Sequence, residues 1–496
     1  MKHCFSRLLC GLVLCALLVT ALPVPASAAR FADVPVGHWA AESIDRSASL
    51  GFFQGDHNGR FGLGRPMTRA AFTVVLCRFF GWDTDGAAAP SRFTDVPADA
   101  WYAGAVGTAF AHGAVTAQST RFRPNASITR EELAVTLIRA LGYGPISGLV
   151  QDLPFKDVQT NRGYLTMALD LGIVQGVTKT AFSPAAPATR EQAAVMLMRL
   201  YDRLHSGETQ ALGVVSSSKD LPDLTQCAAV AVRGGTLTAE GLSEEGQASD
   251  IKAIQAAAGD KPQLLYVTGK RDALTGNPAT QAAALKEAVT GGQWDGLFLD
   301  IAGLNSAADQ TALTALAAAL RENLGETAQL VLAAEAPSSK NLSGTGYDCA
   351  ALSKLADKLV LRPASPVTPD AQNTTAPAEP LEEVYRALRK QSIPADKLIL
   401  WCTSTASCWQ GPAQTDTLSG LDMDALLETD GMLSHASQRF GSIYLVREQP
   451  GQGMETIWYT DADGMARRAE MARLFGVKQI CFSELSGISP SVFSVF

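Results

Sequence analysis

The stretch Phe31-Ala32-Asp33-Val34 returns as Phe93-Thr94-Asp95-Val96 and again as Phe155-Lys156-Asp157-Val158, at intervals of 62 residues. Further landmarks follow each opening in the same order: an aromatic residue, a glycine turn, a phenylalanine and a Thr-Arg pair. Self-similarity at a fixed period is the signature of a repeat architecture. Residues 31–202 are therefore predicted to be three copies of one mostly helical unit.

The Thr-Arg pairs mark where helices begin. They are Thr68-Arg69, Thr129-Arg130 and Thr189-Arg190, and amphipathic segments follow them at 70–80, 131–141 and 191–201. Glu132 and Gln192 complete a capping box in the second and third copies, in which two side chains satisfy the free backbone amides of a helix start. The first copy has Ala71 at that position, so we expect a weaker cap there.

Each arginine of these pairs stands at the first helical position, where a cation opposes the helix dipole. Because helix starts attract anions, three matched arginines favour an anionic ligand. The candidate ligand residues are Arg69, Arg130 and Arg190. The alternative is internal pairing with the aspartates of the three openings, which are Asp33, Asp95 and Asp157. Both hold together if the aspartate orients the arginine.

The recurring aromatic and glycine positions each have two explanations. Trp39 and Trp101 are either platforms for a sugar ring or core residues. The paired glycines of the first and third copies, such as Gly51 and Gly55, are most simply helix ends and turns that need a positive φ. The second copy keeps one of these glycines and has Ala117 in place of the other.

Residues 1–29 have the pattern of a secretory signal segment. Lys2 and Arg7 give a positive start, an apolar run extends from Leu8 to Leu22, and Ala26-Ser27-Ala28 supplies a small-residue cleavage pattern. A membrane anchor is the alternative, but this run is shorter than the ~20 apolar residues that span a bilayer. No later run is long enough, so we expect an exported chain whose mature form has no membrane span.

Composition excludes several classes of protein. The 496 residues are 47% hydrophobic and 18% charged, which fits two or three folded domains and excludes disordered and collagen-like chains. The net charge of -8 without a Lys/Arg block argues against nucleic-acid binding. Cys402 and Cys408 are close enough in sequence to form a disulfide, which export would permit. No cysteine spacing suggests zinc, and nothing suggests a cofactor.

After a polar stretch at 202–210, short apolar runs alternate with helix-patterned segments. Eight candidate strands lie at 211–215, 227–232, 263–267, 296–301, 329–334, 358–361, 397–402 and 478–482, with helical patterns at 309–324, 380–390 and 465–475. This alternation predicts a (β/α)8 barrel. A doubly wound open sheet is the alternative, although no glycine-rich phosphate motif follows the first strand. A hairpin at 442–447 and 456–459 and a proline-rich loop at 363–380 decorate the barrel.

The fourth candidate strand carries the strongest site residue of this barrel. Along Trp294-Asp295-Gly296-Leu297-Phe298-Leu299-Asp300-Ile301-Ala302, positions 298, 300 and 302 share one face. If Leu297 and Leu299 pack outward, Asp300 points into the barrel mouth, where barrel chemistry is located. Glu335 and Glu484 end the fifth and eighth strands and are the other mouth carboxylates. No Ser/His/Asp arrangement or Gly-x-Ser-x-Gly turn is present.

The three copies resemble S-layer homology (SLH) domains in the Phe-x-Asp-Val opening, the tryptophan, the glycine turn, Phe-x-Pro and the Thr-Arg-Ala-Glu type of helix start. The resemblance implies a pseudo-trimeric unit, with copies at 31–90, 91–150 and 151–205, that binds a secondary cell-wall polysaccharide non-covalently. Such units commonly hold an anionic, pyruvylated sugar. It also implies that the three arginines bind the carboxylate while the three aspartates shape the pockets. Because Gly163 replaces the tryptophan of the third copy and Ala71 alters the first, one or two grooves should be weak.

Residues 206–496 resemble family 18 glycoside hydrolases, and more loosely their spore-cortex and surface branch. The likeness rests on the strand at 294–302, which resembles an Asp-x-x-Asp-x-Asp-x-Glu motif at two of its four acidic positions. Further support comes from Tyr347-Asp348 through Asp357-Lys358-Leu359, from Pro394-Ala395-Asp396-Lys397 and from Trp458-Tyr459-Thr460-Asp461. Family catalysis is substrate-assisted and needs a general acid at the last motif position, which is Ala302 here. The middle aspartate is Phe298, and Arg362-Pro363-Ala364-Ser365 replaces Met-x-Tyr-Asp on the sixth strand.

General acid catalysis contributes roughly 10²–10⁴-fold, so these replacements imply a non-catalytic barrel that binds a glycan. The sequence therefore predicts an exported bacterial surface protein tethered to wall polysaccharide, with peptidoglycan or another glycan as a further partner at the barrel mouth. The alternative is an active cell-wall or polysaccharide hydrolase that uses relocated carboxylates, namely Asp300, Glu335 and Glu484.

Overall fold

The computed structural model describes residues 31–86, 93–336, 345–364, 377–389, 391–411, 413–429, 432–449, 451 and 453–495. They form two compact units: residues 31–137 with 183–199, and residues 138–182 with 200–495. The predicted signal segment and most of the proline-rich loop, residues 365–376, lie outside the described residues. No helix in the described ranges is long and apolar enough to cross a membrane.

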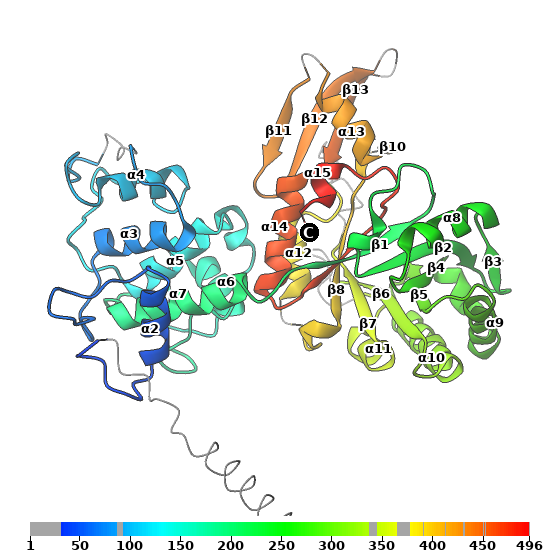
Figure 1. The fold of residues 1–496 in the computed structure, drawn as a ribbon, viewed down its shortest axis with the longest axis horizontal. Helices are drawn as coiled ribbons and strands as arrows, with labels where there is room; N and C mark the ends of the chain where they lie inside the picture. The colour runs from blue at the N-terminus through cyan, green and yellow to red at the C-terminus, as the bar shows by residue number, and fades with distance from the viewer. Residues whose placement is uncertain are drawn as a thin grey trace, which may run out of the picture. The chain divides into compact units, whose positions relative to one another are not determined.

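The three copies are built from pairs of helices joined by long loops, as the blue-to-cyan part of Figure 1 shows. The first helices of the pairs are α2 (Ala41–Ser49), α4 (Ala103–Ala111) and α6 (Arg162–Asp170), and the second helices are α3 (Arg69–Phe80), α5 (Arg130–Ala140) and α7 (Arg190–Leu204). A short 3-10 helix, η1 (Gly144–Leu149), precedes α6. The predicted helices are thus present, and each begins at its arginine.

A ring of backbone hydrogen bonds joins the three copies inside the first unit. The Met67 amide donates to the Ala188 carbonyl (2.9 Å), the Ala188 amide to the Ile128 carbonyl (2.9 Å), and the Ile128 amide to the Met67 carbonyl (2.8 Å). These residues stand directly before the three Thr-Arg pairs, and all three side chains are buried. The backbone amides two residues later form a second set of bonds between copies. The Arg69 amide donates to the Ala126 carbonyl, the Arg130 amide to the Ala186 carbonyl, and the Arg190 amide to the Arg65 carbonyl. The ring therefore links equivalent segments of the three copies within the first unit.

The helix caps differ among the copies. Thr129 makes the complete box: its side chain accepts from the Glu132 amide (3.1 Å), and its own amide donates to Glu132 Oε2 (2.9 Å). In the first copy Thr68 accepts from Ala71 (3.2 Å) with no return bond from that alanine, which confirms the expected weaker cap. In the third copy the Gln192 side chain accepts from the Thr189 amide (3.3 Å), so the second copy has the strongest cap.

The paired glycines have two separate roles. Gly51 and Gly172 adopt φ of +79° and +70°, as the turn interpretation requires. Gly55 and Gly176 are needed for a different reason, because a Cβ there would lie 2.6 Å from the Phe31 ring and 2.4 Å from the Phe155 ring. The positive-φ prediction therefore holds for the first glycine of each pair, and close packing explains the second.

The second unit contains the predicted barrel. Its strands are β1 (Gln210–Val215), β2 (Ala229–Leu237), β4 (Gln263–Lys270), β5 (Gly296–Ala302), β6 (Gln329–Glu335), β7 (Lys358–Arg362), β8 (Leu398–Cys402) and β14 (Gln479–Phe482). They are parallel neighbours in the order β1-β14-β8-β7-β6-β5-β4-β2, and β2 also pairs with β1, with Leu212 opposite Ala229. This last pairing closes the sheet, so the open-sheet alternative is wrong.

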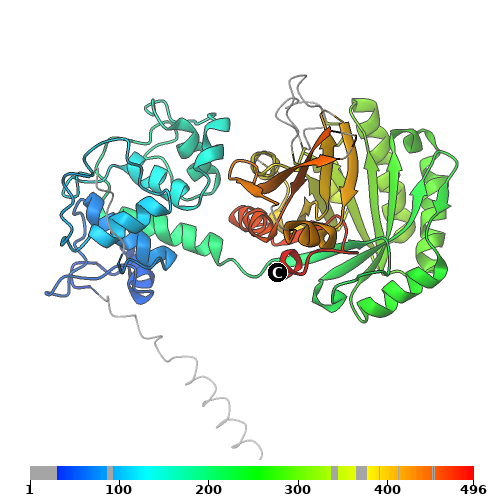
Figure 2. The same ribbon diagram turned by 90° about the horizontal axis from the view of Figure 1, so that it is seen from above.

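Helices cover the outside of the barrel, as Figures 1 and 2 show for the green and yellow segments. They are α8 (Ala248–Ala258), α9 (Pro278–Gly291), α10 (Ala307–Leu324), α11 (Cys349–Leu355), α12 (Leu381–Leu388) and α14 (Ala462–Leu474), with α15 (Pro490–Phe493) near the end. Short elements complete the fold: β3 (Leu242–Glu244), η2 (Leu224–Gln226), η3 (Arg271–Thr275) and η4 (Ala395–Lys397). Alternate side chains from the strands fill the interior, including Phe298, Tyr266 and Trp401.

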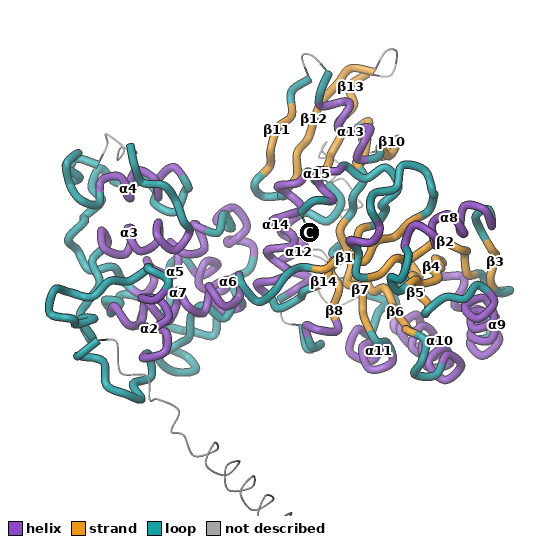
Figure 3. The backbone as a smooth tube through the Cα atoms, viewed as in Figure 1, coloured by secondary structure: helices purple, strands orange, loops and turns teal. Residues whose placement is uncertain are grey.

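A five-stranded antiparallel sheet is inserted between β8 and β14, where the sequence predicted only a hairpin. It comprises β9 (Ala406–Gln410), β10 (Ala413–Leu418), β11 (Ser434–Ser437), β12 (Ser442–Gln449) and β13 (Gly453–Tyr459), in the order β10-β9-β13-β12-β11, with α13 (Gly420–Leu427) between β10 and β11. The strands stand out in orange in Figure 3. Cys402 and Cys408 are buried and unbridged, so the disulfide considered from their spacing is absent.

Candidate functional site

The arginines of the first and third copies each reach into the next copy around the ring. Arg69 Nε donates to the Phe122 carbonyl (2.8 Å), and Arg69 Nη1 lies 2.8 Å from Glu132 Oε1. Arg190 Nε donates to the Phe61 carbonyl (2.8 Å) and its Nη2 to the Gln54 carbonyl (3.0 Å). Each guanidinium also lies over the ring of the phenylalanine whose carbonyl it binds, at 5.1 and 4.9 Å. Much of their donor capacity is therefore used internally.

Arg130, in the second copy, is the most enclosed of the three. It is 7% exposed, whereas the Arg69 side chain is 25% exposed. Burial lowers the pKa of Arg190, although the nearby Asp33 carboxylate acts in the opposite direction. Sequence reasoning treated the three arginines as equivalent, and their surroundings are not.

The three aspartates bind backbone amides. Asp33 accepts from the amides of Phe61 (2.6 Å), Gly62 (2.7 Å) and Leu63 (2.9 Å). Burial would raise the pKa of Asp33, but these amide bonds outweigh it and hold the pKa below its usual value. Asp95 and Asp157 accept from the amides of Phe122 (2.8 Å) and Phe182 (2.9 Å), the equivalent residues.

In the two sets that lie in the first unit, one phenylalanine links the aspartate to the arginine. Phe61 donates to Asp33 and accepts from Arg190, and Phe122 donates to Asp95 and accepts from Arg69. The aspartate thus fixes the peptide that receives the guanidinium. This arrangement corresponds to the combined alternative, in which the aspartate orients the arginine, and it does so without a direct bond between their side chains.

The two tryptophans are surface residues. Trp39 is 63% exposed and Trp101 is 70% exposed, so the core alternative does not hold for either. The third copy cannot carry a tryptophan, because a Cβ on Gly163 would lie 1.8 Å from the Ser147 carbonyl oxygen of η1. The backbone of η1 occupies the space of the missing side chain, which accounts for the departure seen in the sequence.

At the barrel mouth, Asp300 is already engaged. Its carboxylate forms a hydrogen-bonded ion pair with Arg362, and Tyr266 donates to Asp300 Oδ2 (2.9 Å). The side chains of Asp300 and Arg362 are 8% and 19% exposed, so this is a buried pair. Burial alone would lower the pKa of Arg362, but the Asp300 carboxylate outweighs it and holds the pKa above its usual value. Asp300 therefore points inward as predicted and neutralises a cation there.

Glu335 stands on the other side of the same cation. Its Oε1 lies 3.7 Å from Arg362 Nη1, and its side chain is 37% exposed. The Arg362 guanidinium also lies 5.0 Å from the centre of the Trp401 ring. Asp300 Oδ1 and Arg362 Nε are buried and have no hydrogen-bond partner among the described residues. The structure thus brings Asp300, Arg362 and Glu335 together in one cluster.

Glu484 is held away from that cluster by serines. Its carboxylate accepts from the Ser216 hydroxyl and amide after β1, and from the Ser486 amide (2.8 Å). Both carboxylate oxygens are therefore occupied. The sequence grouped Glu484 with the mouth acids because it ends the last strand, but periodicity cannot reveal the serines that bind it.

Sequence reasoning missed a fourth carboxylate, Glu379, which is bound by the residue that follows β8. Glu379 accepts from the Thr403 amide (2.9 Å) and hydroxyl (2.7 Å) and is 5% exposed. Burial raises its pKa, against the bonds from Thr403 and the charge of Arg468. Glu379 lies in the proline-rich loop, where no periodic pattern marked it.

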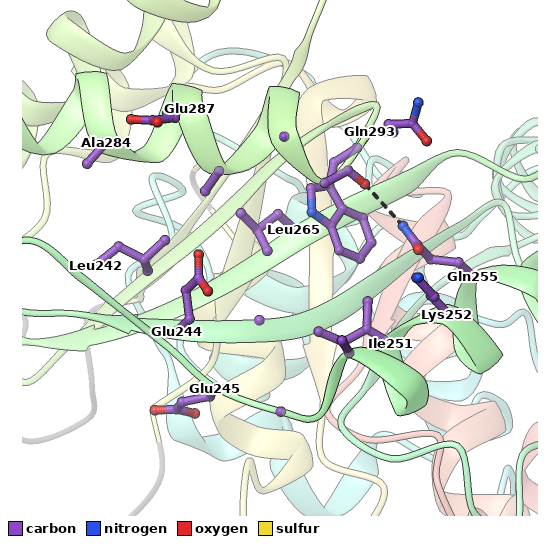
Figure 4. A pocket seen from close by; sticks show the side chains of 17 residues that line it. Leu242, Glu244, Glu245, Ile251, Lys252, Gln255, Leu265, Ala284, Glu287 and Gln293 are labelled. Atoms are coloured by element: carbon purple, nitrogen blue, oxygen red, sulfur yellow. Dashed lines mark hydrogen bonds between the residues drawn. The ribbon is translucent and has the colours of Figure 1, made fainter.

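A cavity of about 720 Å³ lies on the flank of the barrel between α8 and α9. Trp294 lines it together with Leu265, Glu244, Lys252 and Glu287, and Figure 4 labels the last four of these side chains. None of the site residues predicted from the sequence lines it. Within the described ranges, no group of three or more His, Cys, Asp or Glu side chains could hold a metal ion.

Comparison with known protein families finds three matches, one in each of the three copies. The sequence matches the S-layer homology domain family at residues 30–73, 92–134 and 154–194. The chain carries three SLH domains. It is 31% identical over 201 residues to the surface-layer 125 kDa protein of Lysinibacillus sphaericus, covering 38% of this chain and 16% of that protein. It is 27% identical over 180 residues to the S-layer protein sap of Bacillus anthracis, covering 36% and 22%. The chain therefore spans less than a quarter of these relatives.

The barrel has the fold of chitinases. The chitinase from Chromobacterium violaceum matches with a TM-score of 0.50 and 18% identity, over 58% of this chain and 97% of that chain. The C-terminal domain of a putative chitinase from Desulfitobacterium hafniense matches with a TM-score of 0.50 and 14% identity, over 58% and 98%. Three SLH domains are thus followed by a barrel like that of glycoside hydrolases. The SLH domains and the surface-layer relatives indicate a cell-surface, cell-wall-associated location.

Proposed function

We propose that the SLH domains hold the exported chain non-covalently to an anionic, pyruvylated secondary cell-wall polysaccharide, and that the barrel is a glycan-binding module without hydrolase activity. The tether rests on the SLH match and on the ring of backbone hydrogen bonds that links one segment of each copy. Its proposed contact residues are Arg69, Arg130, Arg190, Asp33, Asp95, Asp157, Trp39 and Trp101.

One observation carries the proposal for the barrel: Asp300 is bound by Arg362 and Tyr266 in the place where a reacting sugar would need a free carboxylate. The neighbouring position that would supply the general acid is Ala302, which has no proton to give. Peptidoglycan or another glycan remains the proposed partner at the mouth.

A hydrolase with relocated carboxylates is the second candidate. Glu335 favours it, because its side chain is 37% exposed next to the mouth. Asp300 and Glu484 weigh against it, since Asp300 is neutralised by a cation and both oxygens of Glu484 accept hydrogen bonds from serines.

Two assays test the proposal. For the tether, the purified full chain is mixed with wall sacculi before and after removal of the secondary polysaccharide. We expect sedimentation with the first and loss of binding with the second, and equal binding to both would refute the tether. For the barrel, the chain is incubated with chitin oligomers and peptidoglycan, and new reducing ends are measured. We expect none, and release that is lost in Glu335→Gln would establish the hydrolase instead.

A further inference from the structure

A second arginine recurs nine residues after the first in every SLH copy, at Arg78, Arg139 and Arg199. At 3.6 residues per turn, nine residues amount to two and a half turns. The second arginine therefore projects from the opposite face of its helix. Arg69 and Arg190 bind carbonyls of the next copy, and the second arginines face another surface.

Arg78 lies in a cavity of about 550 Å³ in the first unit. The cavity is lined by residues of α3, by the segment that follows α3 and by the start of α4, including Trp82, Thr84, Asp85 and Trp101. Arg78 is an exposed residue, and no carboxylate of the described residues lies within 4.0 Å of its guanidinium. Its five donors are thus free toward the cavity.

Aromatic stacking supports one wall of this cavity. Trp82 stacks on His112 with ring centres 4.1 Å apart and 3° between planes, and on Phe80 at 4.9 Å and 15°. Trp101 has 70% of its surface exposed and leans edge-on against Tyr102 at 5.3 Å. An exposed indole face beside a guanidinium, a hydroxyl and a carboxylate combines an apolar platform with donors and acceptors.

This combination matches a pyranose ring, which has an apolar C–H face and a polar rim. We propose that the cavity binds one saccharide unit of the wall polysaccharide, with Trp101 as the platform and Arg78 as the cationic donor to its oxygen atoms. The inference rests on the proposed wall tether and deepens it: Trp101 is already one of its proposed contact residues, and Arg78 joins it here, at the other end of α3 from Arg69.

The equivalent position at the end of the second copy's helix α5, where it faces the third copy, is closed. Arg139 Nε lies 3.4 Å from the Tyr164 hydroxyl, and its guanidinium lies 5.1 Å from the centre of the Tyr164 ring. Gly163 replaces the tryptophan, and η1 fills the space above it. Arg139 therefore serves as a control. It occupies the same repeat position as Arg78 but has Gly163 in place of a tryptophan beside it.

The test measures binding of the full chain to sacculi that carry the secondary polysaccharide, with wild type, Arg78→Ala, Arg78→Lys, Trp101→Ala and Arg139→Ala. A hydrogen bond to a charged group is worth about 1.5–3 kcal/mol, so we expect Arg78→Ala to weaken binding about 10- to 100-fold. Trp101→Ala should do the same, Arg78→Lys should restore part of the loss, and Arg139→Ala should bind within about twofold of wild type.

The outcomes separate the two proposals. If wild type binds but Arg78→Ala and Trp101→Ala bind equally well, the cavity is not a saccharide site and the tether stands. If wild type binds stripped sacculi as well as intact ones, the tether fails and this inference fails with it. Thermal unfolding of each variant checks that the loss is local, and because both side chains are exposed, we expect unchanged midpoints. Quenching of tryptophan fluorescence by the purified polysaccharide, absent in Trp101→Phe, gives an independent readout.

Discussion

Replacing Arg362 with methionine tests whether the barrel mouth is built as a buried ion pair. The change keeps most of the side-chain volume but leaves the Asp300 carboxylate, 8% exposed, with the Tyr266 hydroxyl as its remaining described partner. Removing one partner of a buried pair costs about 3–5 kcal/mol. Because Arg362 is 19% exposed and Tyr266 still donates, we expect the lower end, about 3 kcal/mol.

In a unit of this size about 1 kcal/mol shifts the unfolding midpoint by roughly 2–4 °C, so the barrel transition should fall by roughly 6–12 °C in scanning calorimetry of the full chain at pH 7. Two controls sharpen the result. Arg233→Met breaks the exposed pair with Glu245, 42% and 38% exposed, and should cost less than about 1 kcal/mol. The double variant Asp300→Leu/Arg362→Met should recover most of the loss. A single variant within 2 °C of wild type at pH 7 would refute this account of the mouth.

Three further predictions concern stability. Gly163→Ala should cost about 1–3 kcal/mol by urea titration, since its Cβ would overlap the Ser147 carbonyl; an unchanged midpoint would show that η1 can move aside. Thr129→Ala should cost about 1 kcal/mol by removing the complete cap, and Thr68→Ala less, in the same titration; equal losses would contradict the ranking of the caps. Burial raises the folded-state pKa of Glu379 above its unfolded value, so the native state binds more protons than the unfolded state. This residue therefore lowers the free energy of unfolding as the pH rises from the ordinary carboxyl range through the raised pKa. Glu379→Gln should therefore lose less stability than wild type between pH 5 and 8, and parallel profiles would count against a raised pKa.

The barrel was predictable because strands of a closed parallel sheet are covered on both sides and appear as short apolar runs. The inserted sheet was not, since β10 is almost wholly exposed and its Ala-Gln-Thr-Asp-Thr-Leu sequence has no apolar alternation.

The helix starts were predictable from the Thr-Arg pairs, because capping is a local interaction. The phenylalanine that links Asp33 to Arg190 was not, since that contact joins residues 129 positions apart through a backbone carbonyl.

Arg78 and Glu379 could not be predicted as site residues, for physical reasons. Capping marks the helix starts locally, but no local signal marks Arg78, which lies nine residues after Arg69 on the opposite face of α3. Glu379 was passed over because it follows a stretch rich in proline and threonine, where neither a helical nor a strand period applies. Its role depends on hydrogen bonds from Thr403, which directly follows β8.

The backbone hydrogen bonds among Met67, Ile128 and Ala188 form a closed ring, although the chain that forms this ring is linear. Deleting one copy would remove two of the three hydrogen bonds of this ring. It would leave one backbone amide and one backbone carbonyl without a partner, each on a different remaining copy. A shortened two-copy chain should therefore recruit a missing third from another molecule and assemble, whereas a circularly permuted chain with all three copies should remain a single closed unit.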